Sequence, residues 1–397
     1  MRDLSRRQIL AAATGATLLG TIQPGVGAVA RTLQDKGIEG VTPKDYGAAA
    51  DGVTVDVVAI RKAFAASKTV RFSQGTYNFG DIGANGVLVD LTALGPGITM
   101  IVDAGAEFLC NTTDNTLTAF FLLESNSHFT VKGTASFRDT GYNGLSTPIR
   151  GAVGFLLTNH TAHNWGDVNI EAIHGHRIVA PLLINGTVSA ADRVRDIVVG
   201  HIVADDCYYG FNAQNQGDRV GIGKISAYRC YRPYFVYGVT AHEVEVVNRA
   251  PRSNSGAVNI SRSDGGLPTR GIRVRYSERE NVVLTTTAHV LINHIGPSLG
   301  EISGIHVTYD IEDLAGAAPP VKIVTYTAPG GVETNALLAN VVDDVHISGK
   351  CVGRNGAVTC TANYTAKGRL HWGGGPGSSY DGTIPKQFRI DDNYAPA

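Results

Sequence analysis

Asp205 and Asp206 are neighbouring acids that follow a short apolar run and precede a cysteine. Two carboxyl groups at one site can carry out glycoside hydrolysis, because one protonates the leaving oxygen and the other acts as base or nucleophile. Neighbours in a regular strand point to opposite faces, so both acids face one site only if the chain turns there. Otherwise Asp218 or a histidine must supply the second role.

The segments around these acids repeat. Three stretches can be laid over one another: DVNIEAIHGHRI from Asp167, DIVVGHIVADDC from Asp196 and RVGIGKISAYRC from Arg219. A small residue follows each second strand, at Gly175, Ala204 and Ala227, with Ala250 next in the same register, and the steps are 29, 23 and 23 residues. Such self-similarity predicts stacked units of three short strands, each stable only against its neighbours. DVHISGKC from Asp344 extends the series.

This register predicts which side chains share one line of the stack, about 4.8 Å apart. The first offset holds His176, Asp205, Tyr228 and Pro251, the second holds Arg177, Asp206, Arg229 and Arg252, and a later one places Tyr208 over Tyr231. Acids, bases and aromatic rings together suit a glycan site. We expect catalytic roles for Asp205, Asp206 and Arg229, and substrate-binding roles for His176, Arg177, Tyr208, Tyr228, Tyr231 and Arg252. The alternative interpretation is a charge ladder that only neutralises stacked groups.

A lyase would use the same line differently. β-Elimination from a uronate needs a base and a group that neutralises the carboxylate, roles open to Tyr228, Arg229, His176 and Lys224. A Ca²⁺ ion held by aspartate could also neutralise the acid, although no compact calcium-loop motif is visible. His174 and His176 have no third ligand in register, so we expect no metal site, and hydrolysis requires no cofactor.

Composition narrows the function classes. The chain of 397 residues has 34 Lys and Arg against 35 Asp and Glu, so no basic excess points to nucleic acid. Glycine is abundant, with 48 residues, and methionine is scarce, with 2, which is typical of a β-rich protein with many turns.

The N-terminus reads as a targeting segment. Paired arginines at Arg6 and Arg7 precede a weakly apolar run too short to span a membrane and then Ala28-Val29-Ala30, a candidate cleavage site. This pattern predicts a twin-arginine-type export signal over 1–30, with a general secretory signal as the alternative. Both imply a bacterial protein exported to the periplasm or the extracellular space.

Residues 45–77 must form a separate element. Asp51-Gly52 predicts a turn, Thr54 a helix cap, and the spacing of Val57, Ile60, Phe64 and Ser67 a short amphipathic helix. A strand at 70–72 and a turn at Gln74-Gly75 follow.

This segment, DYGAAADG…GTY, resembles the entry to the pectate-lyase-like (pectin lyase-fold) right-handed parallel β-helix superfamily. The resemblance implies that the helix caps a solenoid whose side groove handles polysaccharide. DIVVGHIVADDC is also similar, distantly, to polygalacturonase-type glycoside hydrolases, where a strand leads into Gly-Asp-Asp-Cys. Here Gly175-His176-Arg177 and Arg229-Cys230 stand at the flanking positions, and that family's usual companions of the aspartate pair do not recur.

We therefore expect an all-β, single-stranded right-handed parallel β-helix with an N-terminal capping α-helix. Residues 31–80 would form the cap, 81–314 the rungs, and 315–397 the last rungs and an irregular C-terminal cap. The expected function is an exported carbohydrate-active enzyme acting on a polysaccharide or oligosaccharide, with a glycosidase favoured, a polysaccharide lyase as the alternative, and a noncatalytic glycan-binding or assembly β-helix third. We expect no nucleic-acid partner and no membrane span, and related solenoids make a homotrimer a candidate assembly.

Overall fold

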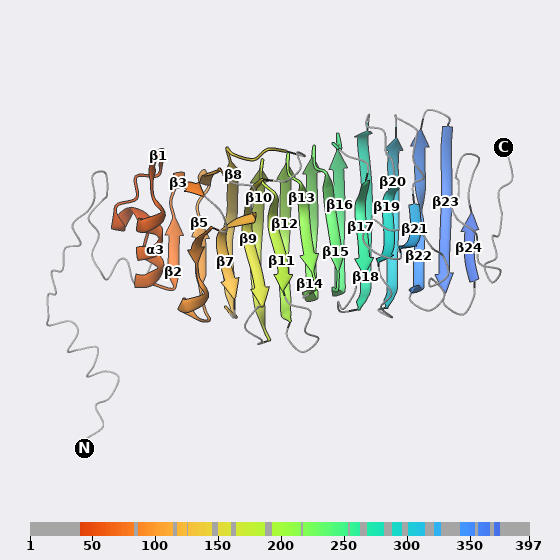
Figure 1. Ribbon diagram of the computed structural model, residues 1–397, viewed down its shortest axis with the longest axis horizontal. Helices are drawn as coiled ribbons and strands as arrows, with labels where there is room; N and C mark the ends of the chain where they lie inside the picture. Colours follow the sequence, from red (N-terminus) through yellow and green to blue (C-terminus); the bar gives the residue numbers. More distant parts are fainter. Residues whose placement is uncertain are drawn as a thin grey trace, which may run out of the picture.

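The computed structural model is an elongated stack of strands with a helix near its N-terminal end (Figure 1). It describes residues 40–82, 86–113, 117–124, 126–144, 150–159, 164–186, 193–215, 217–252, 255–262, 268–281, 288–295, 301–313, 321–326, 342–353, 356–365 and 369–373. The predicted export signal, 1–30, lies outside the described residues. Among the helices of the described segments, none has the length and apolar character needed to cross a bilayer.

The N-terminal cap is built as the sequence predicts, with one exception. It comprises η1 (Pro43–Tyr46), β1 (Asp51–Val55), α3 (Val57–Ala66), β2 (Thr69–Phe72) and β3 (Gly75–Ile82). The ring of Phe64 on α3 packs against those of Phe72 and Phe121, with centroids 6.1 and 6.2 Å apart, so the helix closes the end of the core. The predicted cap at Thr54 is wrong: Thr54 lies in β1 and its hydroxyl donates to Asp51, whereas Asp56 precedes the helix.

Asp56 ties this cap together from a buried position. Its carboxylate accepts backbone N–H groups of Ala49, Ala50 and Asn78, at 2.8 to 3.2 Å. Burial raises the pKa of Asp56 despite these donors. The turn, the helix start and strand β3 are thereby held at one point.

Two sheets run the length of the stack. Sheet A contains β1, β2, β3, β5 (Thr99–Val102), β6 (Ala106–Thr112), β8 (Phe129–Asp139), β10 (Trp165–His176), β12 (Val194–Asp205), β14 (Gly217–Tyr228), β16 (Thr240–Arg249), β18 (Thr269–Asn281), β20 (Ile302–Asp313), β22 (Val342–Gly353), β23 (Gly356–Thr365) and β24 (Arg369–Gly373). Sheet B contains β4 (Val87–Asp90), β7 (Leu117–Glu124), β9 (Gly151–Asn159), β11 (Ala180–Gly186), β13 (Tyr209–Gln214), β15 (Arg232–Tyr237), β17 (Ser255–Arg262), β19 (Ala288–Ile295) and β21 (Val321–Tyr326); the 3-10 turn η2 (Thr92–Leu94) follows β4.

Chain order shows how these sheets make a solenoid. From β8 onward each long strand of sheet A is followed by a shorter strand of sheet B, and neighbours within each sheet pair in parallel up to β22. The all-β parallel β-helix is therefore confirmed. The strand predicted at DVHISGKC is β22, and the antiparallel strands β23 and β24 follow it.

The predicted three short strands per rung appear as two, because the long strand bends without leaving its sheet. In β12, Ile197 and Val199 point inward, Gly200 and His201 both point outward, and inward alternation resumes at Ile202. The backbones crowd at the bend: a Cβ on Gly200 would lie 2.5 Å from the carbonyl oxygen of Glu171. The bend gives each rung a third face.

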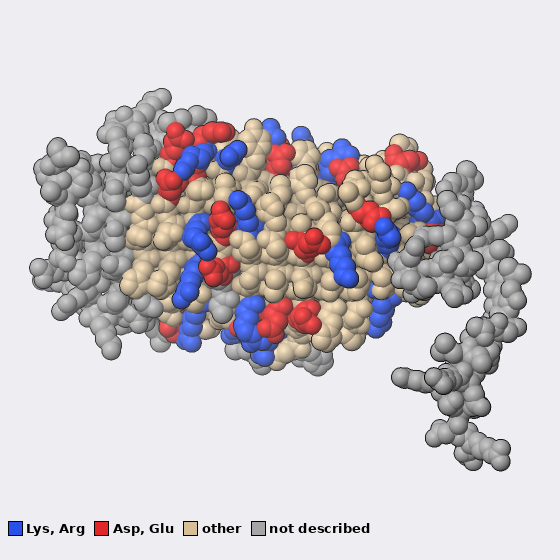
Figure 2. Space-filling view, turned by 180° about the vertical axis from the view of Figure 1, so that it is seen from behind, with Lys and Arg blue, Asp and Glu red and all other residues tan. Residues whose placement is uncertain are grey.

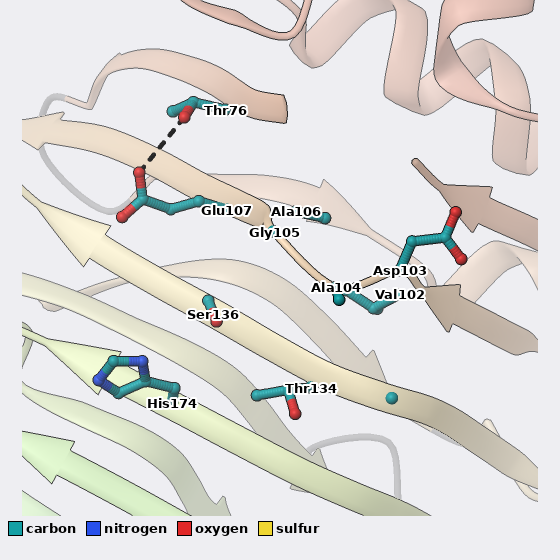
Figure 3. A pocket seen from close by; sticks show the side chains of 11 residues that line it. Thr76, Val102, Asp103, Ala104, Gly105, Ala106, Glu107, Thr134, Ser136 and His174 are labelled. Carbon is teal, nitrogen blue, oxygen red and sulfur yellow. Dashed lines mark hydrogen bonds between the residues drawn. The ribbon is translucent and has the colours of Figure 1, made fainter. Parts of the chain in front are cut away.

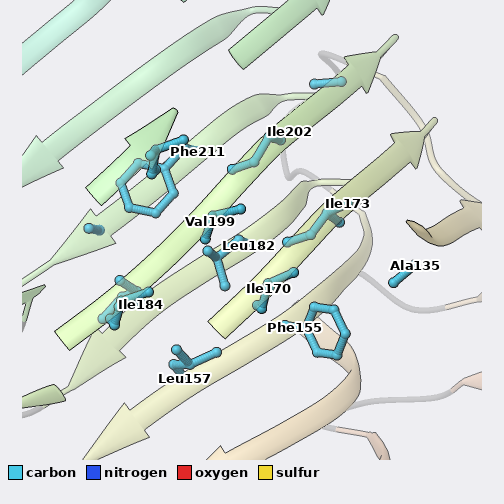
Figure 4. Packing of buried hydrophobic residues seen from close by; sticks show 14 of the residues in the cluster. Ala135, Phe155, Leu157, Ile170, Ile173, Leu182, Ile184, Val199, Ile202 and Phe211 are labelled. Carbon is cyan, nitrogen blue, oxygen red and sulfur yellow. The ribbon is translucent and has the colours of Figure 1, made fainter. Parts of the chain in front are cut away.

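The core fills the space between the sheets. Aliphatic side chains of β10, β11 and β12 interdigitate with phenylalanines of neighbouring rungs, including Phe155 and Phe211 (Figure 4). Each such side chain, when fully buried, contributes roughly 1.5–3 kcal/mol. This packing fixes the alternation that sends every second residue of the long strands to the surface.

Candidate functional site

The sheet A strands of successive rungs end level with one another, and this places several predicted site residues side by side. His176, Asp205 and Tyr228 pair in register at the ends of β10, β12 and β14. Arg138 on β8 lies beside His176, and Arg249 on β16 lies beside Tyr228. We call these five residues, Arg138, His176, Asp205, Tyr228 and Arg249, the terminal row. Inward neighbours such as Ala204 belong to the core, so the row faces solvent.

Asp205 is the centre of this row. Its Oδ2 lies 3.0 Å from Nδ1 of His176, and its Oδ1 accepts Nη2 of Arg229 at 3.0 Å. The side chains of His176 and Asp205 remain 35% and 28% exposed. The hydrogen bond to Asp205 raises the pKa of Arg229. One carboxylate thus orients an imidazole and a guanidinium while all three stay accessible.

This contact sets the tautomer of His176. A carboxylate only accepts hydrogen bonds, so Nδ1 must carry the proton and Nε2 of the neutral ring keeps its lone pair. An imidazole oriented in this way can take a proton from a bound molecule. Beside it, the guanidinium of Arg229 lies 4.6 Å from the ring centre of Tyr228, whose side chain is exposed.

Asp206 has different surroundings from Asp205. The backbones of Arg177, Asp206 and Arg229 take left-handed conformations, with φ of 53°, 56° and 53°, and turn the chain out of sheet A. The chain does turn at the aspartate pair, but the two carboxylates have different partners. Asp206 is only 10% exposed and accepts Nη1 of Arg252 at 2.7 Å. Asp206 therefore anchors the turn.

The predicted position of Arg252 is wrong. Ala227 pairs with Asn248, two residues before the expected Ala250, so Arg249 takes the place predicted for Pro251. Ala250 follows it in the left-handed corner. The backbone N–H of Arg252 bonds to Cys230, as that of Tyr231 bonds to Cys207, which places Arg252 in the column of the tyrosines. The cause is a register shift between β14 and β16 at the bend.

Tyr208 and Tyr231 lie beyond the corner, toward sheet B. Their rings stack with centroids 4.6 Å apart at 29°, and the guanidinium of Arg232 lies 5.3 Å from the ring centre of Tyr231. Burial raises the pKa of Tyr208 to about 12, so this phenol stays protonated at neutral pH. Nη2 of Arg177 donates to the Tyr142 carbonyl at 3.4 Å. These residues form a corner next to the row.

The other residues considered for acid–base roles have partners elsewhere. Asp218 lies near the start of β14, within 3.8 Å of Arg193, 3.7 Å of Arg195 and 3.3 Å of Arg219. Nζ of Lys224 lies 3.6 Å from Glu245. The structure therefore joins His176, Asp205, Tyr228 and Arg229, and it sets Asp218 apart from them. Within the described segments, no three His, Cys, Asp or Glu side chains are grouped to hold a metal ion.

Arg138 and Arg249 are the row members that the sequence comparison missed. Arg138 was detectable, since Phe137 before it occupies the core position of Gly175. Arg249 was hidden by the register shift in β16. Positive charge thus extends on both sides of Asp205, whereas Figure 2 shows acids and bases interspersed on the face turned away from the view of Figure 1.

Comparison with known proteins finds no matching family model, no matching curated protein and no matching solved structure.

Proposed function

We propose that the protein is an exported carbohydrate-active enzyme that cleaves an acidic polysaccharide or oligosaccharide at the terminal row, by β-elimination. The observation that carries this proposal is the contact of His176 with Asp205 beside Arg229 and the exposed Tyr228. The export signal read from residues 1–30 supports exposure to such polymers.

The proposed reaction uses groups already in place. Nε2 of His176 takes the proton from C5 of a uronate, the C4–O4 bond breaks as a C4=C5 double bond forms, and the Tyr228 hydroxyl gives a proton to the departing oxygen. Water then returns both side chains to their starting protonation states. The backbones of His176 and Tyr228 are two strand spacings apart, roughly 9.6 Å, which leaves room for a sugar residue over Asp205.

Cations supply the remaining requirement. Acidity at C5 increases when the neighbouring carboxylate is neutralised, and Arg229 has N–H groups besides the one bonded to Asp205. Arg138 and Arg249 extend the positive charge to the sugars on either side. A row of arginines suits carboxylates, because each guanidinium can donate two parallel hydrogen bonds.

Hydrolysis is the second candidate, favoured by the exposure of the Asp205 carboxylate beside His176. In this version Asp205 and His176 activate water. The usual pair of carboxylates would require Asp206, whose carboxylate is paired with Arg252 instead.

The test is to incubate the full chain with acidic and neutral polysaccharides from bacteria and plants. Elimination predicts ultraviolet absorbance from unsaturated uronate together with new reducing ends. Reducing ends without that absorbance would replace elimination by hydrolysis. No cleavage of any polymer would overturn the enzymatic proposal and favour a noncatalytic solenoid.

A further inference from the structure

A cleft of about 470 Å³ opens on sheet A beside the terminal row, between the β5–β6 connection and β8 (Figure 3). Ser136 on β8 and His174 on β10 line it, and each lies two residues before a member of the row. The cleft and the row therefore occupy neighbouring positions on one face.

A mismatch in strand length creates the cleft. Val102 pairs with Gly133 and Glu107 pairs with Ser136, so four residues of the β5–β6 connection lie opposite two residues of β8. The surplus residues turn away through Gly105, which has a φ of +81°. Gly133 has a φ of +84°, and a Cβ there would lie 2.1 Å from the Val102 carbonyl oxygen. The hollow is therefore a property of the backbone.

The acids in the cleft are already neutralised. Glu107 accepts Nε and Nη2 of Arg138 at 2.9 and 2.8 Å, and it also accepts the Thr76 hydroxyl at 3.4 Å. Asp103 accepts Nε of Arg71 at 3.0 Å. Each carboxylate keeps lone pairs for further hydrogen bonds, while its charge is balanced by a guanidinium.

The rest of the lining is small and polar. Thr134 and Ser136 contribute hydroxyls, and burial, with a smaller contribution from His176, lowers the pKa of His174. The imidazole is thus neutral at pH 7 and offers one donor and one acceptor. Among the residues that line the cleft there is no Lys, Arg, Phe, Tyr or Trp. Many acceptors and hydroxyls without net charge suit an uncharged, hydroxyl-rich ligand.

We propose that this cleft binds an uncharged sugar residue next to the acidic sugars of the terminal row, so that the substrate is a glycan containing both neutral and acidic residues. The proposal relies on the proposed function for the acidic part of the substrate. Binding in the cleft does not require cleavage.

The experiment measures binding in the full chain carrying His176→Gln, so that turnover does not interfere. The probes are methyl glycosides of glucose, galactose, mannose and N-acetylglucosamine, with methyl glucuronide as the charged comparison, titrated by ligand-observed NMR. Ser136→Trp fills the cleft, and Ser226→Trp is its matched control, at the same register position two rungs beyond His174. We expect Ser136→Trp to weaken binding of a neutral probe at least tenfold and Ser226→Trp to leave it unchanged.

Equal binding by the two tryptophan variants, no binding by any neutral probe, or preference for the glucuronide would overturn the proposal. If Ser136→Trp does not fold, Glu107→Gln replaces it, with Glu243→Gln as control, because Glu243 also pairs with an arginine on sheet A but lies outside the cleft. A protein that binds a neutral probe in the cleft yet cleaves no polymer would retain this inference and lose the enzymatic one.

Discussion

The Nδ1 atom of His176 lies 3.0 Å from Oδ2 of Asp205, across two adjacent rungs of the solenoid. This contact makes Asp205 a positioning residue, whose value lies in the tautomer and direction that it gives to His176. In Asp205→Asn the amide can no longer serve both His176 and Arg229 as a charged acceptor. Cleavage should fall roughly 10²- to 10⁴-fold. Because both side chains are partly exposed, the thermal unfolding temperature should change little, and a steady-state pH profile should show an altered limb for His176.

Asp206 provides the contrasting variant. Its carboxylate is 10% exposed and pairs with Arg252, so Asp206→Asn should weaken folding more than catalysis. The expected loss in the free energy of unfolding lies between the roughly 1 kcal/mol of an exposed pair and the about 3–5 kcal/mol of a buried one. Denaturant unfolding and the cleavage rate per folded molecule separate the two effects. Loss of cleavage with unchanged stability would instead make Asp206 a catalytic acid or base.

Gly133 tests the origin of the cleft. A side chain at Gly133 meets both an unfavourable left-handed φ and the Val102 carbonyl, so Gly133→Ala should lower the free energy of unfolding by about 2 kcal/mol or more. Gly221→Ala is the control, since the nearest atom to its Cβ would be 3.9 Å away, and this variant should stay within about 1 kcal/mol of the parent protein. Equal unfolding midpoints for the two variants would contradict the account of the β5–β6 mismatch.

His174 should contribute to acid sensitivity. Burial lowers its pKa in the folded state, while the unfolded chain has the ordinary value of about 6.5. The unfolded state therefore binds a proton more readily, so the stability contributed by the neutral ring is full above about pH 6.5 and is lost as the pH falls toward the lowered folded value. Denaturant unfolding from about pH 8 to about pH 5 should show a shallower decline for His174→Gln than for the parent protein. Parallel declines would contradict the burial of this imidazole.

The solenoid and the centre of the terminal row could be predicted, because the first two repeat steps match the observed register. His176 to Asp205 spans 29 residues and Asp205 to Tyr228 spans 23, as the repeats indicate. The next step, from Tyr228 to Arg249, spans only 21. The small residue used as the marker is replaced there by Asn248, which is buried and donates to the Tyr276 hydroxyl at 3.2 Å.

Other features depend on backbone geometry that a residue pattern does not encode. Alternation places Asp205 and Asp206 on opposite sides of a strand, but their partners follow from the left-handed corner at Asp206. The cleft similarly arises from a difference in residue number between two paired connections. Neither signal is visible in one repeat taken alone.

The most direct test of the central claim compares His176→Gln with His201→Gln on the acidic polymer that the parent protein cleaves best. Both histidines lie outward on sheet A, but His201 contacts the Ser226 hydroxyl at 2.9 Å and lies outside the terminal row. The account predicts that formation of unsaturated uronate falls at least 100-fold in His176→Gln, in keeping with the loss of a general base, and stays near the parent rate in His201→Gln. Equal rates for the two variants would contradict the assignment of the terminal row as the reaction site.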